Sequence, residues 1–494
     1  MPAPVADFVF VLIVCGLFVL DRERETHASK ALWIPVVWVW IAGSRAVSQW
    51  LATFGYGAPV SVNLADQYLD GSPIDRGIYA TLLVLGLIVL SRRVPRVQRL
   101  LWVNVPIFLF FAYSAASVIW SDYPDVASKR WIKAVGDLVM MIVVLTESDR
   151  VTAVKRLLAR AAFLLIPFSV LLIKYHPEWG RTYNPHDWTW LYTGVTEGKN
   201  LLGMSCLIFG LGSVWRFLST YKEPKSRTRS RQLIAHGVIV AMVLWLFSIT
   251  NSMTSLACFL LGIALMLATS LHAVSRKPVL IHLLVVALVI SSCSALFLNW
   301  GGTLEVMGRD SSLTGRTGIW NVVLDVAQSP VIGTGFESFW LGTRLETIWT
   351  VQNGWFNGIN EAHNGYLEVY LNLGWIGILL LAGVLVSGYR VVIAGFRQDK
   401  DAGRLGLAYF VVVIIYNFTE AGFRMLSVTW ISFLLAILYV PPVPAHTRRI
   451  IPRRGISGKN LSQGVEAEAP QLSESLLRSI RRQSEFFSLT KNLG

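Results

Sequence analysis

A histidine beside an apolar segment is the residue of this sequence best suited to chemistry. It lies in Glu361-Ala362-His363-Asn364, and after nine further residues the chain reads Gly374-Trp375-Ile376-Gly377. Because an imidazole titrates near neutral pH, His363 can move a proton there. A solvated histidine at the start of a helix fits the same pattern. Taken alone, the residue leaves both interpretations open.

The residues around His363 carry similar alternatives. Glu361 can orient the imidazole, or it can cap a helix as a first-turn carboxylate. Asn364 can bind the adjacent turn or a substrate hydroxyl. Gly374 and Gly377 allow another helix to approach closely.

Arg316 is the second candidate, because its planar guanidinium matches phosphate oxygens through paired hydrogen bonds. It precedes a helical apolar pattern that runs from Ile319 to Val326 and that Ser329-Pro330 should end. A surface arginine paired with Asp310 or Glu305 is the alternative. Three other cations share this ambiguity: Arg181, Lys199 and Arg344.

These residues belong to a chain that must lie in lipid. It has 494 residues, of which 54% are hydrophobic and only 15% are charged. Soluble domains carry about 25% charged residues. Apolar runs long enough to cross a bilayer recur along the sequence, which predicts an all-α polytopic membrane protein with about twelve or thirteen spans. The expected spans are 5–20, 31–50, 77–90, 100–119, 132–146, 157–173, 200–219, 233–250, 253–271, 279–298, 365–388, 405–419 and 425–440.

The charge pattern predicts which loops face which side. The net charge is +14, and its lysines and arginines concentrate in alternate loops and in the tail 441–494. The positive-inside rule places those segments in the cytoplasm, where anionic lipids rather than nucleic acid are the expected partner. The residues 1–440 then form the transmembrane domain, with long outer loops at 174–199 and 299–363.

The first long outer loop is rich in aromatic residues. They either form an aromatic belt at the headgroup level or offer flat rings on which sugars can stack, and the sequence supports both interpretations. These residues are Trp179, Tyr183, Trp188, Trp190 and Tyr192.

Several of these segments resemble one family, the O-antigen ligases and polymerases. His363-Asn364 with Gly374-x-x-Gly377 is similar to the histidine motif of that family, and Gly315-Arg316-x-x-x-Trp320 is similar to its outer-loop motif. The weaker similarities are Pro330-x-x-Gly333-x-Gly335, Thr193-Gly194-Val195-Thr196 with Asn200, and, for the exopolysaccharide-production (ExoQ-like) branch, Trp120-Ser121-Asp122-Tyr123-Pro124 with Lys129-Arg130.

The resemblance implies a GT-C-type, inverting glycosyltransferase of the bacterial inner membrane. Its donor would be an oligosaccharide linked to undecaprenyl diphosphate at the periplasmic face. The acceptor would be a carrier-linked repeat unit in a polymerase, or lipid A core in a ligase. The ExoQ-like segment favours the polymerase, which could also work with a chain-length regulator or export proteins.

The resemblance also assigns roles to residues. His363 would be the base and Arg316 would stabilise the leaving diphosphate, with Lys199 and Arg181 as further cations. Asn200, Asn364 and Glu361 would contact substrate.

The resemblance implies that transfer needs neither a metal ion nor another cofactor. The sequence agrees, because it has no DxD motif, no expected carboxylate cluster on the outer face and no zinc-type spacing of its four cysteines.

One position departs from the family pattern. Met253 stands in Thr250-Asn251-Ser252-Met253-Thr254-Ser255, where the family often has an arginine at the outer start of a helix. Lys199, Arg181 or the hydroxyls of Ser252 and Thr254 would then have to supply the second phosphate contact. A transporter or flippase and a non-catalytic scaffold are the competing classes. The first should have charges at mid-membrane, and the second gives no reason for the histidine motif.

Overall fold

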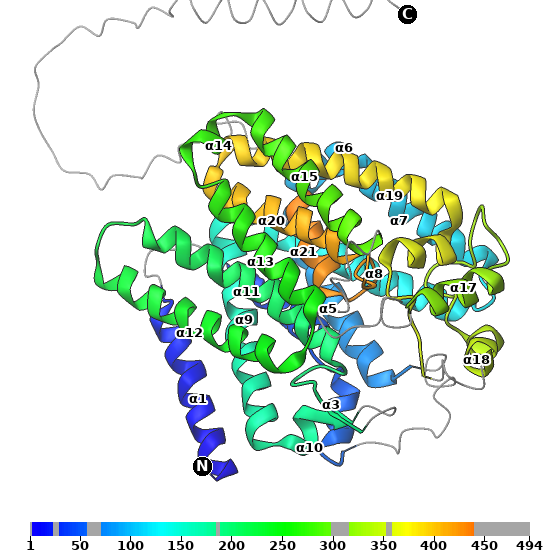
Figure 1. The fold of residues 1–494 in the computed structure, drawn as a ribbon, viewed down its shortest axis with the longest axis horizontal. Helices are drawn as coiled ribbons and strands as arrows, with labels where there is room; N and C mark the ends of the chain where they lie inside the picture. Colours follow the sequence, from blue (N-terminus) through cyan, green and yellow to red (C-terminus); the bar gives the residue numbers. More distant parts are fainter. Residues whose placement is uncertain are drawn as a thin grey trace, which may run out of the picture. The chain divides into compact units, whose positions relative to one another are not determined.

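Helices make up almost all of the regular structure. A computed structural model describes residues 2–22, 29–56, 71–183, 188–297, 316–351 and 358–438 (Figure 1). In these ranges the only sheet is a two-stranded antiparallel hairpin of β1 (Arg181–Tyr183) and β2 (Trp190–Tyr192), in which Arg181 pairs with Tyr192. The predicted all-α class is confirmed. The tail 441–494 and residues 298–315 lie outside the described ranges.

The helices follow one another along the chain with short connections. In the first half they are α1 (Ala3–Leu20), η1 (Lys30–Leu32), α2 (Trp33–Ala42), α3 (Val47–Thr53), α5 (Pro73–Ser91), α6 (Val94–Val103), α7 (Val105–Ala116), η2 (Ser117–Trp120), α8 (Pro124–Leu145), α9 (Arg150–Tyr175) and α10 (Pro177–Gly180). In the second half they are α11 (Lys199–Tyr221), α12 (Arg227–Thr250), α13 (Met253–Ala268), α14 (His272–Arg276), α15 (Pro278–Phe297), α17 (Arg316–Val326), α18 (Gly342–Thr350), α19 (Gly365–Gln398), α20 (Lys400–Tyr416) and α21 (Val428–Ile437).

Six helices of the described ranges are long and apolar enough to cross a membrane: α1, α5, α9, α11, α12 and α19. The count rises to eight if the bent pairs 30–53 and 94–120 each form one span, and α13, α15 and α21 contain shorter apolar helices. The polytopic architecture is therefore confirmed. The sequence predicts about twelve or thirteen spans, which is more than these helices supply. The predicted span 132–146 belongs to α8, whose first half is charged, and 405–419 belongs to α20, which has 17 residues.

The bundle has an inner and an outer set of helices. The side chains of α9, α11, α20 and α21 are mostly buried against one another, whereas α1 exposes residues such as Phe8 (63%) and Val19 (59%). Apolar side chains exposed along whole helices need a non-aqueous neighbour. Lipid supplies that neighbour around α1, α5 and α15. In Figure 1, α17 and α18 lie beside the start of α19, next to the end of the bundle where the histidine stretch begins.

α19 is broken near its start. Gly374 has φ +64°, so the helix bends there, and the freed amides of Trp375 and Ile376 donate to the carbonyls of Pro330 (2.9 Å) and Val331 (3.2 Å). The expectation that Gly374 admits another helix is wrong. It instead admits the loop after α17, whose backbone atoms would lie 2.3 Å from a Cβ at that position.

We expect Gly374→Ala to separate this loop from α19. A left-handed backbone costs an L residue about 1–2 kcal/mol, and the Cβ would meet the backbone of Val331. Thermal unfolding of the purified protein should therefore begin several degrees lower. Gly383→Ala, in the same helix with no atom within 4 Å of the new Cβ, is the matched control and should be neutral or stabilising. Equal melting temperatures for both variants would contradict the docking role.

Candidate functional site

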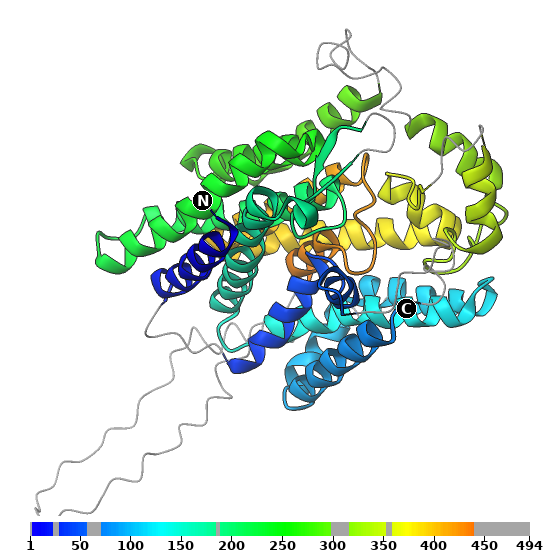
Figure 2. The same ribbon diagram turned by 90° about the horizontal axis from the view of Figure 1, so that it is seen from below.

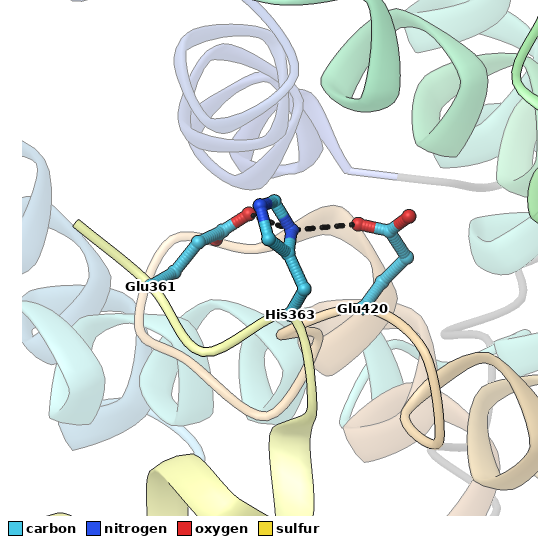
Figure 3. A group of neighbouring side chains, drawn as sticks. All are labelled: Glu361, His363 and Glu420. Atoms are coloured by element: carbon cyan, nitrogen blue, oxygen red, sulfur yellow. Dashed lines mark hydrogen bonds and ion pairs between the residues drawn. The ribbon is translucent and has the colours of Figure 1, made fainter. Parts of the chain in front are cut away.

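His363 lies between two carboxylates. Its Nδ1 is 2.9 Å from Oε1 of Glu361 and 3.4 Å from Oε2 of Glu420 (Figure 3). Its side chain is 26% exposed, and its backbone is left-handed with φ +49°. Non-glycine residues rarely hold that conformation unless their surroundings enforce it. The imidazole is therefore fixed at the rim of the bundle with one ring edge open.

Backbone contacts around the start of α19 fix this conformation. Asn364 caps the helix, because its Oδ1 accepts the amides of Tyr366 (3.0 Å) and Leu367 (3.1 Å). The Gly365 amide donates to the carbonyls of Asn417 (2.9 Å) and Glu420 (3.1 Å). A Cβ on Gly365 would lie 1.8 Å from Oδ1 of Asn417, so only glycine lets the two segments meet. Asn364 thus binds the adjacent turn, and its contact with a substrate hydroxyl stays a prediction.

Arg316 joins the same carboxylate from another element. Its Nη2 is 2.6 Å from Oε1 of Glu420, with both side chains nearly buried. Four residues into α17, the Trp320 indole donates to the carbonyl of Ala362 at 2.8 Å, which ties α17 to the histidine stretch. The proposed partners Asp310 and Glu305 lie outside the described residues. Glu420 is the partner that the structure provides.

The start of α11 forms another side of the site. Asn200 donates from Nδ2 to Oε2 of Glu420 at 3.3 Å, and Lys199 precedes it as the first residue of the helix. The start of α13 also approaches, since Thr419, next to Glu420, donates to the Thr254 hydroxyl at 3.3 Å. Thr254 follows Met253, so a hydroxyl lies next to the position at which the family pattern often has an arginine.

Arg181 is held elsewhere. Its Nε donates to the carbonyl of Ile173 at 2.9 Å, and its guanidinium lies over the rings of Trp190 and Tyr192. In the described ranges no contact joins it to Glu361, His363 or Glu420. The aromatic residues of this loop therefore contact Arg181. Tyr183 stacks on Trp190, with the two ring centroids 4.0 Å apart.

A second arginine, Arg424, pairs with carboxylates beside the site. Arg424 lies 3.1 Å from Oε2 of Glu361 and 3.7 Å from Oε2 of Glu337. The buried Glu368 carboxylate accepts the Ala362 amide at 2.6 Å and the Trp340 indole at 3.0 Å. Every carboxylate next to the histidine stretch is thus hydrogen-bonded or paired, as buried charges must be. Of the two roles considered for Glu361, orientation of the imidazole is the one observed.

The carboxylates change the charge state of the imidazole. Burial alone would lower the pKa of His363, but Glu361 first and Glu420 second raise it to about 10. Burial would raise the pKa of Glu361, whereas the charges of His363 and Arg424 lower it to about 2. The expectation that His363 titrates near neutral pH is therefore wrong for the unliganded site, where it is an imidazolium.

The similarity to known proteins falls on these segments. A family described as O-antigen ligase (Wzy_C) matches residues 226–382, which include Arg316, His363 and the kink at Gly374. The exopolysaccharide production protein ExoQ of Rhizobium meliloti (strain 1021) is 26% identical over 291 residues, or 57% of this chain. About a third of the chain is thus similar to the O-antigen ligase family, and a longer stretch is similar to ExoQ. The match spans 64% of the length of that relative.

Three possible ligand atoms at the site converge in a way that a metal ion could use. Those of Glu361, His363 and Glu420 lie within 4.8 Å of one another. The expected absence of a carboxylate cluster is thus wrong, because the loop fold brings together acids that are far apart in sequence. Both carboxylates, however, already carry a guanidinium partner, Arg424 on Glu361 and Arg316 on Glu420. A metal ion would have to displace or repel those cations.

Glu420 and Arg424 are the site residues that sequence reasoning missed. They flank the short polar break Thr419-Glu420-Ala421-Gly422-Phe423-Arg424 between two apolar stretches, and they lie outside the segment that the O-antigen ligase family matches. A signal was present, since ionisable residues at the end of a membrane span usually have a functional partner. The identity of that partner depends on where the other loops lie, so the sequence alone could not give it.

The charge state of His363 can be tested by its reactivity. Diethylpyrocarbonate attacks a neutral imidazole, so His363 should resist it at pH 7 and become reactive as the pH approaches about 10. Glu361→Gln removes the largest stabilising charge, so reaction should begin at a lower pH. Peptide mass spectrometry follows the modification, and the exposed His272 corrects for reagent loss.

Glu346→Gln is the matched control, because it removes one exposed carboxylate from the same loop. It should leave the reactivity profile unchanged. Rapid modification of His363 at pH 7 in the unaltered protein would overturn the imidazolium assignment.

Proposed function

We propose that this protein is a polysaccharide polymerase of the inner membrane. It would transfer a glycan from an undecaprenyl-diphosphate donor to a carrier-linked repeat unit at the periplasmic face, with inversion at the anomeric carbon. The observation that carries the proposal is the carboxylate of Glu420, which holds Arg316, His363 and Asn200 together at one end of the bundle. Two of these are the residues to which the family resemblance assigns chemistry.

The donor diphosphate replaces Glu420 as the partner of Arg316. A guanidinium binds two phosphate oxygens at once, and it is worth most when it faces charge that grows during bond cleavage. The His363 imidazolium lies on the same carboxylate and supplies a second positive charge. Thr254 and Asn200 add neutral donors, and Lys199 adds a cation at the start of α11. No metal ion is required for this stabilisation.

The replacement of Glu420 by the donor diphosphate also accounts for the proton transfer. The acceptor hydroxyl forms the new bond to the anomeric carbon as the bond from that carbon to the phosphate oxygen breaks. Its proton must go to a base, and an imidazolium has no free lone pair. Glu420, released by Arg316, accepts the proton, while His363 orients that carboxylate. We therefore keep His363 and Arg316 as catalytic residues and add Glu420 as the proton acceptor.

The ligase is the second candidate, because the matching family is described as O-antigen ligase. A ligase would use lipid A core as its acceptor. The ExoQ relative, whose printed role is exopolysaccharide production, favours the polymerase. A chain-length regulator or export proteins would then be its partners. A flippase is less well supported, because the charged cluster lies at helix ends and loops.

We expect Arg316→Gln and Glu420→Gln each to lower the transfer rate about 10²–10³-fold, the usual cost of removing a group that stabilises the transition state. His363→Asn should have a loss of similar size. Purified protein with a synthetic carrier-linked repeat unit, followed by polymer length on gels, measures the rate.

Arg344→Gln is the matched control, because Arg344 lies in the same loop but pairs with the exposed Asp122. It should retain near-normal activity. Melting temperatures identify any variant that fails to fold. A rate that rises steadily up to pH 10 would show that neutral His363, not Glu420, takes the proton.

The acceptor class needs its own experiment. The purified protein is supplied with carrier-linked repeat units, once alone and once with lipid A core. A polymerase should elongate the units without the core. Transfer only onto the core would make the protein a ligase, and no transfer in either arm, with folded protein, would refute both.

A further inference from the structure

A cavity lies between α2, α5 and α8. Its volume is about 370 Å³, and four cations line it: Arg76 from the first turn of α5, and Lys129, Arg130 and Lys133 from the first half of α8. The lining also includes apolar and aromatic side chains such as Tyr79, Leu83 and Ile132. A hollow lined by both cations and apolar side chains fits an amphiphile with an anionic head.

Three of the four cations, Arg76, Lys129 and Lys133, form no salt bridge with a carboxylate of the described residues. Asp75, the neighbour of Arg76, accepts from the amide (3.0 Å) and the hydroxyl of Ser48. Its charge also acts on Lys133, without a salt bridge between the two. Lys133 lies 5.4 Å from the ring centroid of Tyr79, which is a weak substitute for an anion.

The position of Arg76 in its helix also favours an anionic ligand. Arg76 lies in the first turn of α5, where the backbone dipole disfavours positive charge. On the proposed topology this end of the bundle faces outward, where the positive-inside rule also disfavours cations. Such side chains are retained more readily when an anionic ligand offsets both effects.

The apolar part of the cavity opens toward lipid. Ile132 is 47% exposed on α8, and the outward face of α5 exposes Ile74 (48%), Val84 (54%) and Leu87 (49%). A hydrocarbon chain can lie along this face while its head reaches the cations. A soluble anion would make no use of that surface.

The cavity is also connected to the candidate site. Arg130, between Lys129 and Trp131 on α8, donates from Nη1 to the backbone carbonyl of Glu337, whose side chain contacts Arg424. Met425, the neighbour of Arg424, forms part of the cavity wall. The cavity therefore borders the segment that supports the candidate site.

We propose that this cavity binds a lipid with a phosphate or diphosphate headgroup, as a second lipid site distinct from the one around Arg316. Arg76, Lys129 and Lys133 contact the headgroup, and the lipid chain lies along α5 and α8. This lipid site does not depend on the proposed transfer reaction, since a protein with no transferase activity would still bind the lipid.

Photolabelling tests the site directly. The full-length protein in phosphatidylcholine nanodiscs is irradiated with farnesyl diphosphate or phosphatidylglycerol, each carrying a diazirine in its chain. Peptide mass spectrometry then measures labelling of 71–91 and 124–145. The combined change Arg76→Gln, Lys129→Gln and Lys133→Gln should raise the half-saturating lipid concentration on the order of 100-fold.

The control combines Arg92→Gln, Lys277→Gln and Arg390→Gln, which removes the same charge from exposed positions. It should label as the unaltered protein does. Stronger labelling by farnesyl diphosphate identifies a polyprenyl carrier, and stronger labelling by phosphatidylglycerol identifies a phospholipid; either supports the site. Equal labelling of the cavity variant and its control would overturn it. Full competition by inorganic diphosphate alone would refute a lipid ligand.

Discussion

The carboxylate of Glu420 is the interaction on which the candidate site depends. One of its oxygens binds Arg316 at 2.6 Å, and the other faces both His363 and Asn200. These partners come from α17, the start of α19 and the start of α11. Without a shared anion, two cations would face each other in a poorly solvated space, which is costly. The carboxylate thus holds these groups together and is also the group that an anionic substrate must displace.

The rest of the architecture holds that carboxylate in place. Asn417 accepts the amides of Gly422 and Phe423, both at 2.8 Å, and so shapes the turn that carries Glu420. Gly365 packs on the same turn, and the kink at Gly374 lets the loop after α17 dock on α19. Catalytic groups on loops need such rigid support. Here broken helices supply it.

The cavity between α2, α5 and α8 differs from the candidate site in how its cations are compensated. At the candidate site Arg316 and Arg424 are already paired with glutamates, so an anionic ligand must compete for them. In the cavity, Arg76, Lys129 and Lys133 form no salt bridge with a carboxylate of the described residues, so a headgroup does not have to displace one. Met425, next to Arg424, lines the cavity, which therefore borders the segment that supports the candidate site.

The membrane class, the resemblance to a family and two of the central residues could be read from the sequence alone. Hydrophobic run length sets the span, and the spacing of His363 and the glycines is local, so both can be read without a fold. The sequence also predicted α17 and its end near Ser329-Pro330. Apolar content alone did not show that α8 carries charge into its first half.

Tertiary structure alone decided which charges meet. Glu420 lies 57 residues from His363 and 104 from Arg316, and no local pattern links them. The role of Gly374 also depended on the fold, since a glycine at helical spacing does not reveal whether a helix or a loop approaches. The protonation of His363 was decided in the same way. A pKa depends on the charges around a group in space, and these charges come from distant parts of the chain.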